Sequence, residues 1–443
     1  MGEKIVVIGG VAAGPAAASK AKRVNPKAEV SIFTDEGDIS YGGCGLPYFI
    51  GKVIKERQTL IARTPEAFKK SGVEIHLNSR VEEIDVQRRE IKVNGKKIPF
   101  DKAIIATGAS AIVPPFEGLN NNGIFTLRTL KDGEKILKYL REKSPRNAVV
   151  VGAGYIGMEM AEALKEWDVK VTVVELMPQI LINMDKDMAE IVEKEIKESG
   201  IDVLTSTKVM GFEGDGNIKQ VVTDKGKIET DFVLLSIGVK PNSELAREAG
   251  IKLGPKGSID VNRQMETSAE GIYAAGDCAD AYHIVTGEKT YIPLGTTANK
   301  QGRIAGNNAA GGKYTAFPGV VGTAIAKVLE LEIARTGLST VEAERAGFKV
   351  KSSYIKAHTT AHYYPGGKDV HVKLIAEEGT GRLIGAQIVG GKGSGLRIDA
   401  LSMAVTNGMR IWDFAYSDFA YAPPFSPVWD PVLIAAQNLL KSF

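Results

Sequence analysis

The feature that most constrains the fold is a complete G-x-G-x-x-G run, Gly152-Ala153-Gly154-Tyr155-Ile156-Gly157. The apolar residues 148–151 before it are typical of a buried parallel strand, and residues 158–167 after it predict a helix. A second apolar strand, 170–174, ends at Glu175, 23 residues after Gly152 (175 − 152). This order and spacing predict a dinucleotide-binding unit, with the pyrophosphate at the helix N-terminus and Glu175 on the ribose.

The residues around Glu175 indicate which nicotinamide dinucleotide binds. A carboxylate at this place accepts a hydrogen bond from the ribose 2′-hydroxyl and repels a 2′-phosphate. The next three residues, Leu176-Met177-Pro178, supply no arginine for such a phosphate. We therefore expect NADH rather than NADPH.

An earlier unit of the same kind opens the chain. Residues 4–8 are an apolar strand that ends at Gly9-Gly10-Val11-Ala12-Ala13-Gly14, before an alanine-rich helix. Val11 replaces the middle glycine of the pattern, which leaves a merely structural turn as an alternative. The following strand, 29–33, is followed by Thr34 and then Asp35. We expect Asp35 to be the ribose acceptor, one place late.

Composition limits the other classes of function. A chain of 443 residues suggests two to four domains, and its net charge of +3 does not imply a nucleic-acid partner. No apolar run is long enough for a membrane span, and the first residues lead straight into a strand, so we expect a cytoplasmic protein. The five histidines are scattered, and His358 and His362 lie in a stretch that does not favour a helix, so no metal site is expected.

The sequence predicts further strands between the two glycine-rich units and after the second one. Residues 71–100 alternate around a turn at Asn94-Gly95 and predict antiparallel strands. Residues 101–109 predict a buried strand that ends in small residues, and residues 234–238 end the second unit. Another strand, 267–277, ends in Gly276-Asp277.

In this order of segments the chain resembles the pyridine nucleotide-disulfide oxidoreductases, flavoproteins that bind two dinucleotides. The resemblance implies an α/β protein with two Rossmann-like domains and a C-terminal α+β dimerisation domain, active as a homodimer. The FAD domain is expected at residues 1–111 and 240–322, the NAD(H) domain at 112–239 and the dimerisation domain at 323–443.

The resemblance also implies which residues hold the cofactors. Those expected to bind FAD are Gly9, Gly10, Ala13, Gly14, Asp35, Ser40, Ala109, Gly276, Asp277 and Ala298. Those expected to bind NADH are Gly152, Gly154, Tyr155, Gly157, Glu159, Glu175 and Gly238.

The candidate redox residue is Cys44, in the loop Ser40-Tyr41-Gly42-Gly43-Cys44-Gly45-Leu46-Pro47-Tyr48. Small neighbours allow a cofactor and a substrate to approach its sulfur, and a thiolate form would be reactive. A buried structural cysteine is the alternative. The other cysteine, Cys278, follows Asp277 in a turn and is expected to be a small packed residue.

Residues that are missing indicate the branch of the family. Phe49 lies five places after Cys44, so the Cys-x4-Cys disulfide of the glutathione-reductase-like members is absent, and no histidine follows His371. Ala12 lies where peroxide- and oxygen-reducing members carry a histidine. The cysteine motif resembles that of coenzyme A-disulfide reductases and NADH-dependent persulfide or polysulfide reductases at Ser40, Cys44, Gly45, Leu46 and Pro47, but has Tyr41 and Gly43 instead of phenylalanine and asparagine.

That branch implies further site residues. Tyr363 and Tyr421 resemble tyrosines that lie near the cysteine and could donate a proton to a leaving thiolate, although aromatic packing at a dimer interface is the alternative. Lys20, Arg23 and Ser40 are expected to contact coenzyme A, although each charged residue could equally be a solvated charge.

The expected activity is the reduction of coenzyme A persulfide, polysulfide or coenzyme A disulfide by NADH, through FAD and Cys44. Cys44 would form a mixed disulfide or persulfide with the substrate. The alternatives are an NADH oxidase or peroxidase that uses a Cys44 sulfenic acid, and a flavoprotein electron-transfer component.

Overall fold

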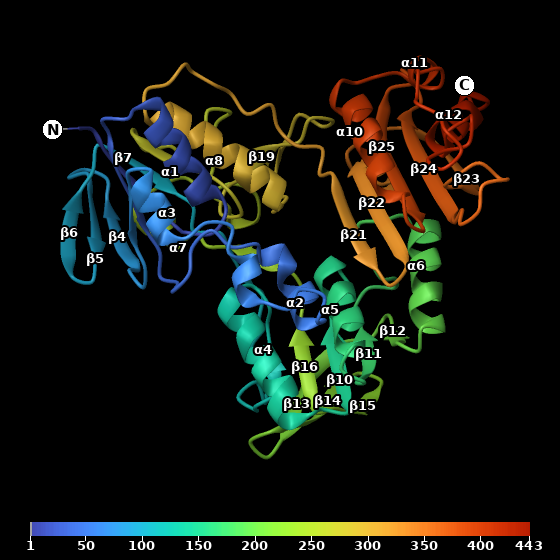
Figure 1. The fold of residues 1–443 in the computed structure, drawn as a ribbon, viewed down its shortest axis with the longest axis horizontal. Helices are drawn as coiled ribbons and strands as arrows, with labels where there is room; N and C mark the ends of the chain where they lie inside the picture. Colours follow the sequence, from blue (N-terminus) through green and yellow to red (C-terminus); the bar gives the residue numbers. More distant parts are fainter. Residues whose placement is uncertain (1) are drawn as a thin grey trace.

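Two parallel sheets organise the N-terminal part of the chain in a computed structural model, which describes residues 2–443 (Figure 1). The first has the strand order β18-β7-β1-β2-β3. Its apolar strands pair in parallel, and α1 and α8 pack against each other beside it. The bounds are β1 Lys4–Ile8, α1 Ala13–Val24, β2 Glu29–Phe33, β3 Val73–His76, β7 Lys102–Ile105, β18 Ile272–Ala274 and α8 Gly295–Ala309.

The second parallel sheet has the order β12-β11-β10-β16-β9 and contains the complete glycine fingerprint. Helix α5 begins at Tyr155, three residues before the predicted start at Met158. The bounds are β9 Ile124–Phe125, α4 Leu130–Lys143, β10 Asn147–Val151, α5 Tyr155–Lys165, β11 Lys170–Val174, α6 Lys186–Glu198, β12 Asp202–Leu204 and β16 Phe232–Leu235.

The stretch 71–100 differs in part from its prediction. Its first strand, β3, joins the parallel sheet beside β2, because its apolar side chains continue that sheet's core. The remaining strands, β4 (Val81–Asp85), β5 (Glu90–Val93) and β6 (Lys96–Pro99), form the expected antiparallel sheet. Asn94 and Gly95 both have positive φ, as a tight two-residue hairpin turn requires.

Two short strands cross between the parallel sheets. β8 (Ala109–Ala111) pairs with β17 (Val239–Pro241) in antiparallel orientation. The predicted domain boundaries near residues 111 and 240 fall at this crossing and stay a prediction. A separate antiparallel sheet contains β13 (Val209–Gly214), β14 (Ile218–Thr223) and β15 (Gly226–Glu229), and the short strands β19 (Ala281–Tyr282) and β20 (Lys289–Thr290) pair with each other.

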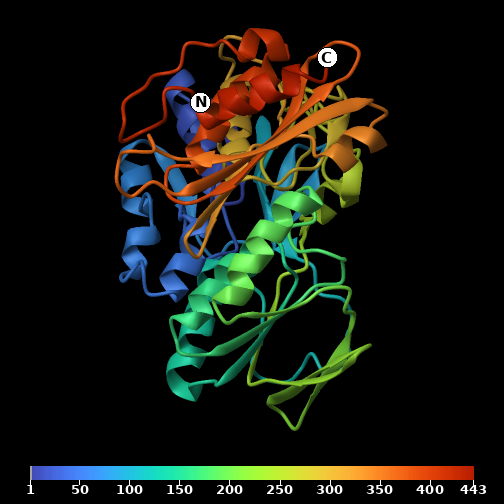
Figure 2. The same ribbon diagram turned by 90° about the vertical axis from the view of Figure 1, so that its right-hand side faces the viewer.

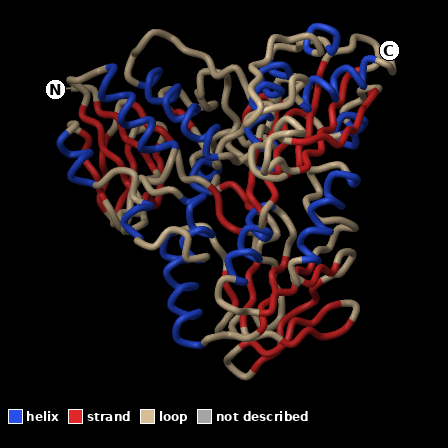
Figure 3. Tube along the Cα trace, turned by 45° about the vertical axis from the view of Figure 1, so that its right-hand side comes forward, coloured by secondary structure: helices blue, strands red, loops and turns tan. Residues whose placement is uncertain are grey.

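The C-terminal part is an antiparallel sheet with helices, drawn in orange and red in Figure 1. Its strand order is β21-β22-β25-β24-β23, with α10 and α12 packed against it. The bounds are β21 Ala324–Val328, β22 Leu331–Gly337, α9 Thr340–Arg345, β23 Val350–His358, β24 Asp369–Glu377, β25 Leu383–Gly390, α10 Ile398–Thr406, α11 Ile411–Phe414 and α12 Pro431–Leu440. The α/β architecture with an α+β C-terminal domain agrees with the prediction (Figure 3).

A buried polar contact joins this sheet to the second parallel domain. Asp185, before α6, is 5% exposed and accepts hydrogen bonds from Thr340, while Lys373 on β24 lies 3.0 Å from its carboxylate. Figure 2 shows α6, in green, reaching the C-terminal sheet. Helices α2 (Leu46–Ile50), α3 (Pro65–Lys70) and α7 (Glu244–Glu248) complete the set. Within residues 2–443, no helix has the length and apolar character to cross a membrane.

Candidate functional site

Cys44 lies in the one-turn segment Gly43–Gly45, which leads into α2. The residue is exposed. The loop before it is fixed by a short antiparallel ladder, in which the Gly42 amide donates to the Leu60 carbonyl at 2.8 Å. A Cβ added at Gly43 would come no closer than 4.0 Å to another residue, and one at Gly42 no closer than 3.8 Å. The glycines therefore leave open space beside the sulfur.

The charges around Cys44 favour its neutral thiol. Although the residue is exposed, enough protein surrounds the sulfur that burial is the largest effect raising its pKa. The carboxylates of Glu159 and Asp277 raise this pKa further, and the Arg128 guanidinium lowers it. Arg128 is held by Asp277 at 3.1 Å and donates to the Ala109 carbonyl at 3.2 Å. Among the described residues, Arg128 is therefore the cation that favours the thiolate of Cys44.

A carboxyl group on α5 lies close to the Cys44 loop. The Tyr48 hydroxyl, one helical turn after Cys44, donates to Glu159 Oε1 at 3.2 Å. Burial raises the pKa of Glu159 to about 7, and within residues 2–443 no cation pairs with it. Glu159 therefore changes its protonation near neutral pH, beside the candidate redox residue.

The first glycine turn brings several predicted FAD residues together. Gly9 has a φ of +116°, and a Cβ there would lie 2.1 Å from the Ala106 carbonyl oxygen. A Cβ on Gly14 would lie 1.9 Å from the Gly9 oxygen, so α1 needs glycine to start this close to β1. The Ser40 amide donates to the Gly10 carbonyl at 2.7 Å, which joins the cysteine loop to this turn.

The Gly276-Asp277 segment reaches the same place from β18. Gly276 has a φ of +86°, and a Cβ there would meet the Ala13 and Ala298 methyl groups at 2.8 and 3.4 Å. Its amide donates to Gln301 Oε1 at 2.9 Å. The turn before α1, the end of β18 and the start of α8 therefore converge, as the predicted FAD residues require.

The helix N-termini at this site differ from the others in the molecule. Among the helices of residues 2–443, α1, α2, α5 and α8 are the ones that have neither a side-chain cap nor an acidic residue in the first turn. The first amides of a helix without a cap need a partner, and the helix dipole favours an anion. The starts of α1 and α8 thus fit FAD, and the start of α5 fits a nicotinamide dinucleotide.

The second glycine turn repeats the geometry of the first. A Cβ on Gly152, which has a φ of +103°, would lie 2.4 Å from the Ser236 oxygen, and one on Gly157 would lie 2.1 Å from the Gly152 oxygen. The Glu175 carboxylate accepts hydrogen bonds from the amides of Ala153 at 2.7 Å and Met177 at 2.8 Å. Glu175 is thus fixed over the turn, where the ribose of a dinucleotide is expected.

Two other predicted NADH residues line the same end of the second sheet. Gly154 immediately precedes α5, and Gly238, after β16, has a φ of +116° that favours glycine. The Tyr155 hydroxyl is buried and has no hydrogen-bond partner within the described residues. Its roles, like those of the other predicted site residues, stay predictions.

The contacts give less support to the predicted roles of three residues, Asp35, Lys20 and Arg23. Asp35 is exposed and forms no hydrogen bond or ion pair within residues 2–443, while the position directly after β2 is occupied by buried Thr34. Lys20 and Arg23 lie on α1, and Arg23 Nε donates to the Ser19 carbonyl.

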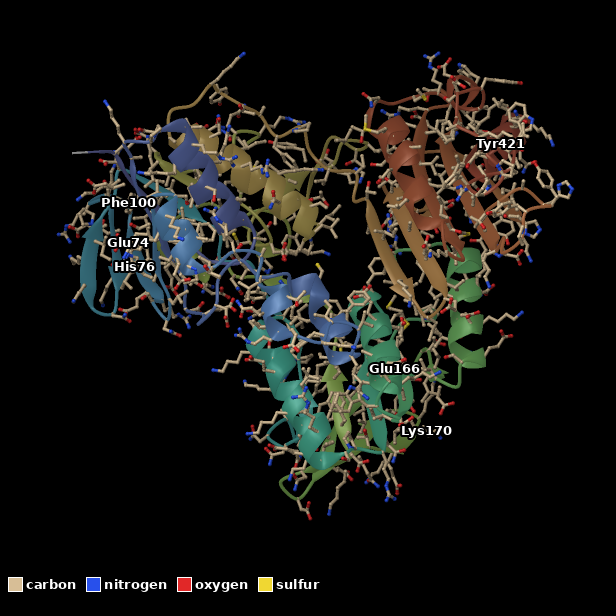
Figure 4. The ribbon with its side chains drawn as sticks, viewed as in Figure 1. Glu74, His76, Phe100, Glu166, Lys170 and Tyr421 are labelled. Atoms are coloured by element: carbon tan, nitrogen blue, oxygen red, sulfur yellow. The ribbon has the colours of Figure 1, made fainter. Side chains whose placement is uncertain are left out.

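The two predicted tyrosines lie together but far from Cys44 in one chain. The hydroxyls of Tyr363 and Tyr421 are 2.8 Å apart, and both residues are exposed on the C-terminal domain. Hydrogen bonding with Tyr363 raises the pKa of Tyr421. Figures 1 and 4 show that Tyr421 lies at the end of this domain away from α2. A single chain does not bring these phenols to Cys44.

Cys278 is fully buried, and its thiol lies 3.4 Å from the Ala275 carbonyl, which confirms that it is a packed residue. His358 ends β23 and His362 follows in a turn, and no cluster within residues 2–443 could hold a metal ion.

Sequence reasoning missed Arg128 and Tyr48. Tyr48 has helical i, i+4 spacing from Cys44, which was a usable signal, whereas nothing local to Arg128 indicates that it meets Asp277.

Comparison with known proteins places this geometry in a family. The model of the pyridine nucleotide-disulphide oxidoreductases matches residues 3–302, and that of their dimerisation domain matches residues 323–431. A relative from Pyrococcus horikoshii, an NAD(P)H coenzyme A polysulfide/persulfide reductase, is 39% identical and covers 99% of each chain. One from Methanocaldococcus jannaschii, an NADH oxidase, is 40% identical, also over 99% of each.

A solved structure, that of a NAD-dependent persulfide reductase from A. fulgidus, is 40% identical and superposes with a TM-score of 0.95, over 99% of this chain and 83% of the other. The match of both family models, together with the two glycine turns and the single exposed cysteine, leads to one conclusion. The chain belongs to the pyridine nucleotide-disulphide oxidoreductase family.

Proposed function

We propose that the protein is an NADH-dependent flavoprotein that reduces coenzyme A persulfide, polysulfide or coenzyme A disulfide at Cys44. The observation that carries this proposal is an exposed cysteine in a glycine loop that a hydrogen bond joins to the first dinucleotide turn, while the other cysteine, Cys278, is free and fully buried. Such a sulfur must form its disulfide with a molecule from outside the chain. The names of the similar reductases support the same class of substrate.

The family's cofactors are FAD and NAD(P)H, and the residues at the helix starts fit both. We expect the amides at the starts of α1 and α8 to hold FAD, with Asp277 on its sugar chain, and those at the start of α5 to hold the nicotinamide dinucleotide. Glu175 makes NADH the preferred reductant, because its carboxylate repels a 2′-phosphate. When bound, the two cofactors supply the electron pair that reduces the sulfur of Cys44.

The chain's own chemistry is nucleophilic. The Cys44 thiolate attacks one sulfur of the substrate, the Cys44 Sγ–S bond forms, the substrate's S–S bond breaks and a thiolate leaves. Arg128 stabilises the attacking thiolate, since its charge lowers the pKa of Cys44. Reduction then returns Cys44 to the thiolate and releases the second sulfur product.

A leaving thiolate needs a proton, and no histidine of this chain follows His371 to provide it. The hydrogen-bonded phenols of Tyr363 and Tyr421 are the expected donors. Because they lie far from Cys44 in one chain, we propose a homodimer in which each C-terminal domain serves the cysteine of the other subunit. A dimerisation domain is present and supports this arrangement. A cytoplasmic location also stays a prediction.

The test is an anaerobic assay of the FAD-loaded protein with NADH and each of the three sulfur substrates, beside oxygen uptake in air. We expect sulfur reduction to be lost in Cys44→Ser, while NADH still bleaches the flavin absorbance. Cys278→Ala is the matched control and should retain activity, since Cys278 is buried away from solvent. Mass spectrometry should find a coenzyme A adduct on Cys44 that dithiothreitol removes.

One rival has an observation in its favour, the similar NADH oxidase of M. jannaschii. In that reading Cys44 passes through a sulfenic acid while oxygen is reduced. Ala12, at the start of α1, offers no acid or base to such a step. Fast oxygen turnover with no activity toward any sulfur substrate would refute our proposal, as would full sulfur reduction by Cys44→Ser.

A further inference from the structure

A buried arginine in the C-terminal domain lies between the two loops that carry Tyr363 and Tyr421. Arg397 directly precedes α10, and its side chain is 11% exposed. Tyr363 belongs to the loop 359–368 between β23 and β24, and Tyr421 belongs to the loop 415–430 between α11 and α12. The chain runs through β24, β25 and α10 from one loop to the other, so only the tertiary structure brings them together.

Arg397 donates hydrogen bonds to both loops. Its NH2 group donates to the Thr359 carbonyl and to the Phe425 carbonyl, each at 2.9 Å. Tyr363 lies four residues after Thr359 (363 − 359), and Tyr421 lies four residues before Phe425 (425 − 421). One guanidinium group therefore fixes the backbone of each loop at the same number of residues from its tyrosine.

The guanidinium group is itself fixed by a buried carboxylate. Arg397 Nε donates to Asp430 Oδ2 at 2.9 Å, and Arg397 NH1 donates to the Gly393 carbonyl. The Asp430 side chain is 9% exposed and accepts further hydrogen bonds from the Ser426 hydroxyl at 2.9 Å and the Val432 amide at 3.0 Å. Buried charges are tolerated when they are paired and hydrogen-bonded, as both charges are here. The ion pair thus holds Arg397 in one orientation.

The two loops also contact each other directly. The Ala361 amide donates to the Pro423 carbonyl at 3.1 Å, and the hydroxyls of Tyr363 and Tyr421 lie 2.8 Å apart. Both phenols are exposed, so no surrounding core fixes them. Their separation therefore depends on the backbone of the two loops, which Arg397 joins.

We propose that Arg397 is a positioning residue for proton transfer to the leaving thiolate, because it keeps the phenols of Tyr363 and Tyr421 within hydrogen-bond distance. This inference rests on the proposed function and deepens it. One phenol gives its proton to the sulfur of the leaving thiolate, and the other hydroxyl donates a hydrogen bond to the phenolate oxygen that remains. Solvent then returns the proton. If the loops separate, the phenolate loses this donor and the transfer becomes slower.

The first experiment compares two disulfides that differ in their need for a proton. Coenzyme A leaves as a basic alkyl thiolate, whereas dithiobis(nitrobenzoate) releases an acidic aromatic thiol that leaves without protonation. With NADH and the FAD-loaded protein, Arg397→Gln should lower kcat/KM for coenzyme A disulfide or persulfide about 10- to 100-fold, as for a displaced catalytic group. The rate with the aromatic disulfide should be unchanged. Arg345→Gln, which removes the same charge from an exposed residue of α9, is the control and should behave as the wild type.

The second experiment asks whether Arg397 acts through the phenols. Tyr421→Phe removes one hydroxyl of the pair and should show the same contrast between the two kinds of disulfide. If both residues serve one proton transfer, the double variant Arg397→Gln/Tyr421→Phe should be no slower than the slower single variant. Losses that multiply would show that Arg397 acts independently of the phenols, and the inference would be wrong.

A third measurement needs no turnover and reports on the loops themselves. Removal of Arg397 leaves the Asp430 carboxylate buried without its cation, so Arg397→Lys, which keeps the charge, is studied beside Arg397→Gln. Hydrogen–deuterium exchange should become faster in both loops of Arg397→Gln, including at the Ala361 amide, and less so in Arg397→Lys. FAD content and melting temperature show whether each variant folds. If Arg397→Gln does not fold, Arg397→Lys carries the comparison of disulfides.

The outcomes separate the inference from the proposed function. Equal losses with both kinds of disulfide would show that Arg397 has only a structural role, and an unchanged rate with the coenzyme A substrates would show that the phenols do not depend on it. Either result overturns the inference. If the wild type reduces no sulfur substrate, the proposed function fails, and hydrogen exchange still decides whether Arg397 holds the two loops together.

Discussion

The two glycine turns of this chain have the same backbone geometry but different side chains at the end of the second strand. In each, the first glycine has a φ above +100° and faces a neighbouring strand end, and the last packs on the carbonyl of the first. In each, the amide of the first glycine donates at 2.8 Å to the carbonyl of the last residue of the neighbouring strand, Gly9 to Phe33 of β2 and Gly152 to Val174 of β11.

The difference lies in the next residue. Glu175 follows β11, and its carboxylate accepts a hydrogen bond from the Ala153 amide. Thr34 follows β2 and is buried beside Gly10. The first unit therefore has no charge at the position where the second has its ribose acceptor. The glycines set the close approach of strand and helix in both units, and we expect the residue after the second strand to decide which dinucleotide binds.

We expect the largest effects from substitutions that disrupt one glycine turn at a time. Gly14→Val and Gly157→Val each place a side chain less than 2.2 Å from a backbone oxygen, so each should destabilise its own domain by roughly 1–3 kcal/mol. Gly14→Val should purify with little FAD. Gly157→Val should retain FAD but lose its reduction by NADH, as flavin absorbance in stopped flow would show. Equal FAD loss in both variants would contradict separate sites.

The next effect concerns the two acidic residues. Glu175→Ala should raise the KM for NADH about 10- to 100-fold, because it removes a charged hydrogen-bond acceptor. The preference for NADH over NADPH should therefore become smaller. Asp35→Ala should weaken FAD binding far less, since Asp35 is exposed and unpaired within residues 2–443. Steady-state kinetics with both nucleotides and FAD titration of the apoprotein measure these effects. A larger loss of FAD than of NADH affinity would reverse our interpretation of the comparison.

The smallest expected effect is a shift in the pH at which Cys44 loses its proton, caused by the nearby carboxylate of Glu159 on α5. The Glu159 carboxylate, which forms as the pH rises through about 7, raises the pKa of Cys44. Glu159→Gln removes that charge, so the midpoint of Cys44 alkylation by iodoacetamide should move to lower pH by roughly half a unit to one unit. Glu166→Gln, at the exposed end of the same helix, should leave the midpoint unchanged.

Stability should follow the same titration. Because burial raises the pKa of Glu159 in the folded state, the unfolded state releases this proton first, and stability falls as the pH rises from about 4.5 to about 7. Glu159→Gln should reduce this fall in melting temperature. An unchanged pH dependence would show that Glu159 does not titrate in this range.

Much of the site could be predicted because its signals are local. The strands, both glycine turns and the segment ending at Asp277 are read from short runs of residues, and the cysteine loop is one such run. Strand β3 was misassigned to the antiparallel group, because its four residues alternate apolar and polar side chains like the strands that follow, although it pairs in parallel with β2. Only the neighbour in space, β2, distinguishes the two.

By itself the sequence determined the two dinucleotide units, the candidate redox cysteine and the expected preference for NADH, since each depends on residues close together in the chain, while the structure showed that Cys44 is exposed. Only the tertiary structure decided that Arg128 meets Asp277 and that Tyr48 meets Glu159. These pairs come from segments far apart in sequence. Charges act through space, so the residues that shift the pKa of Cys44 are defined by packing and leave no local pattern.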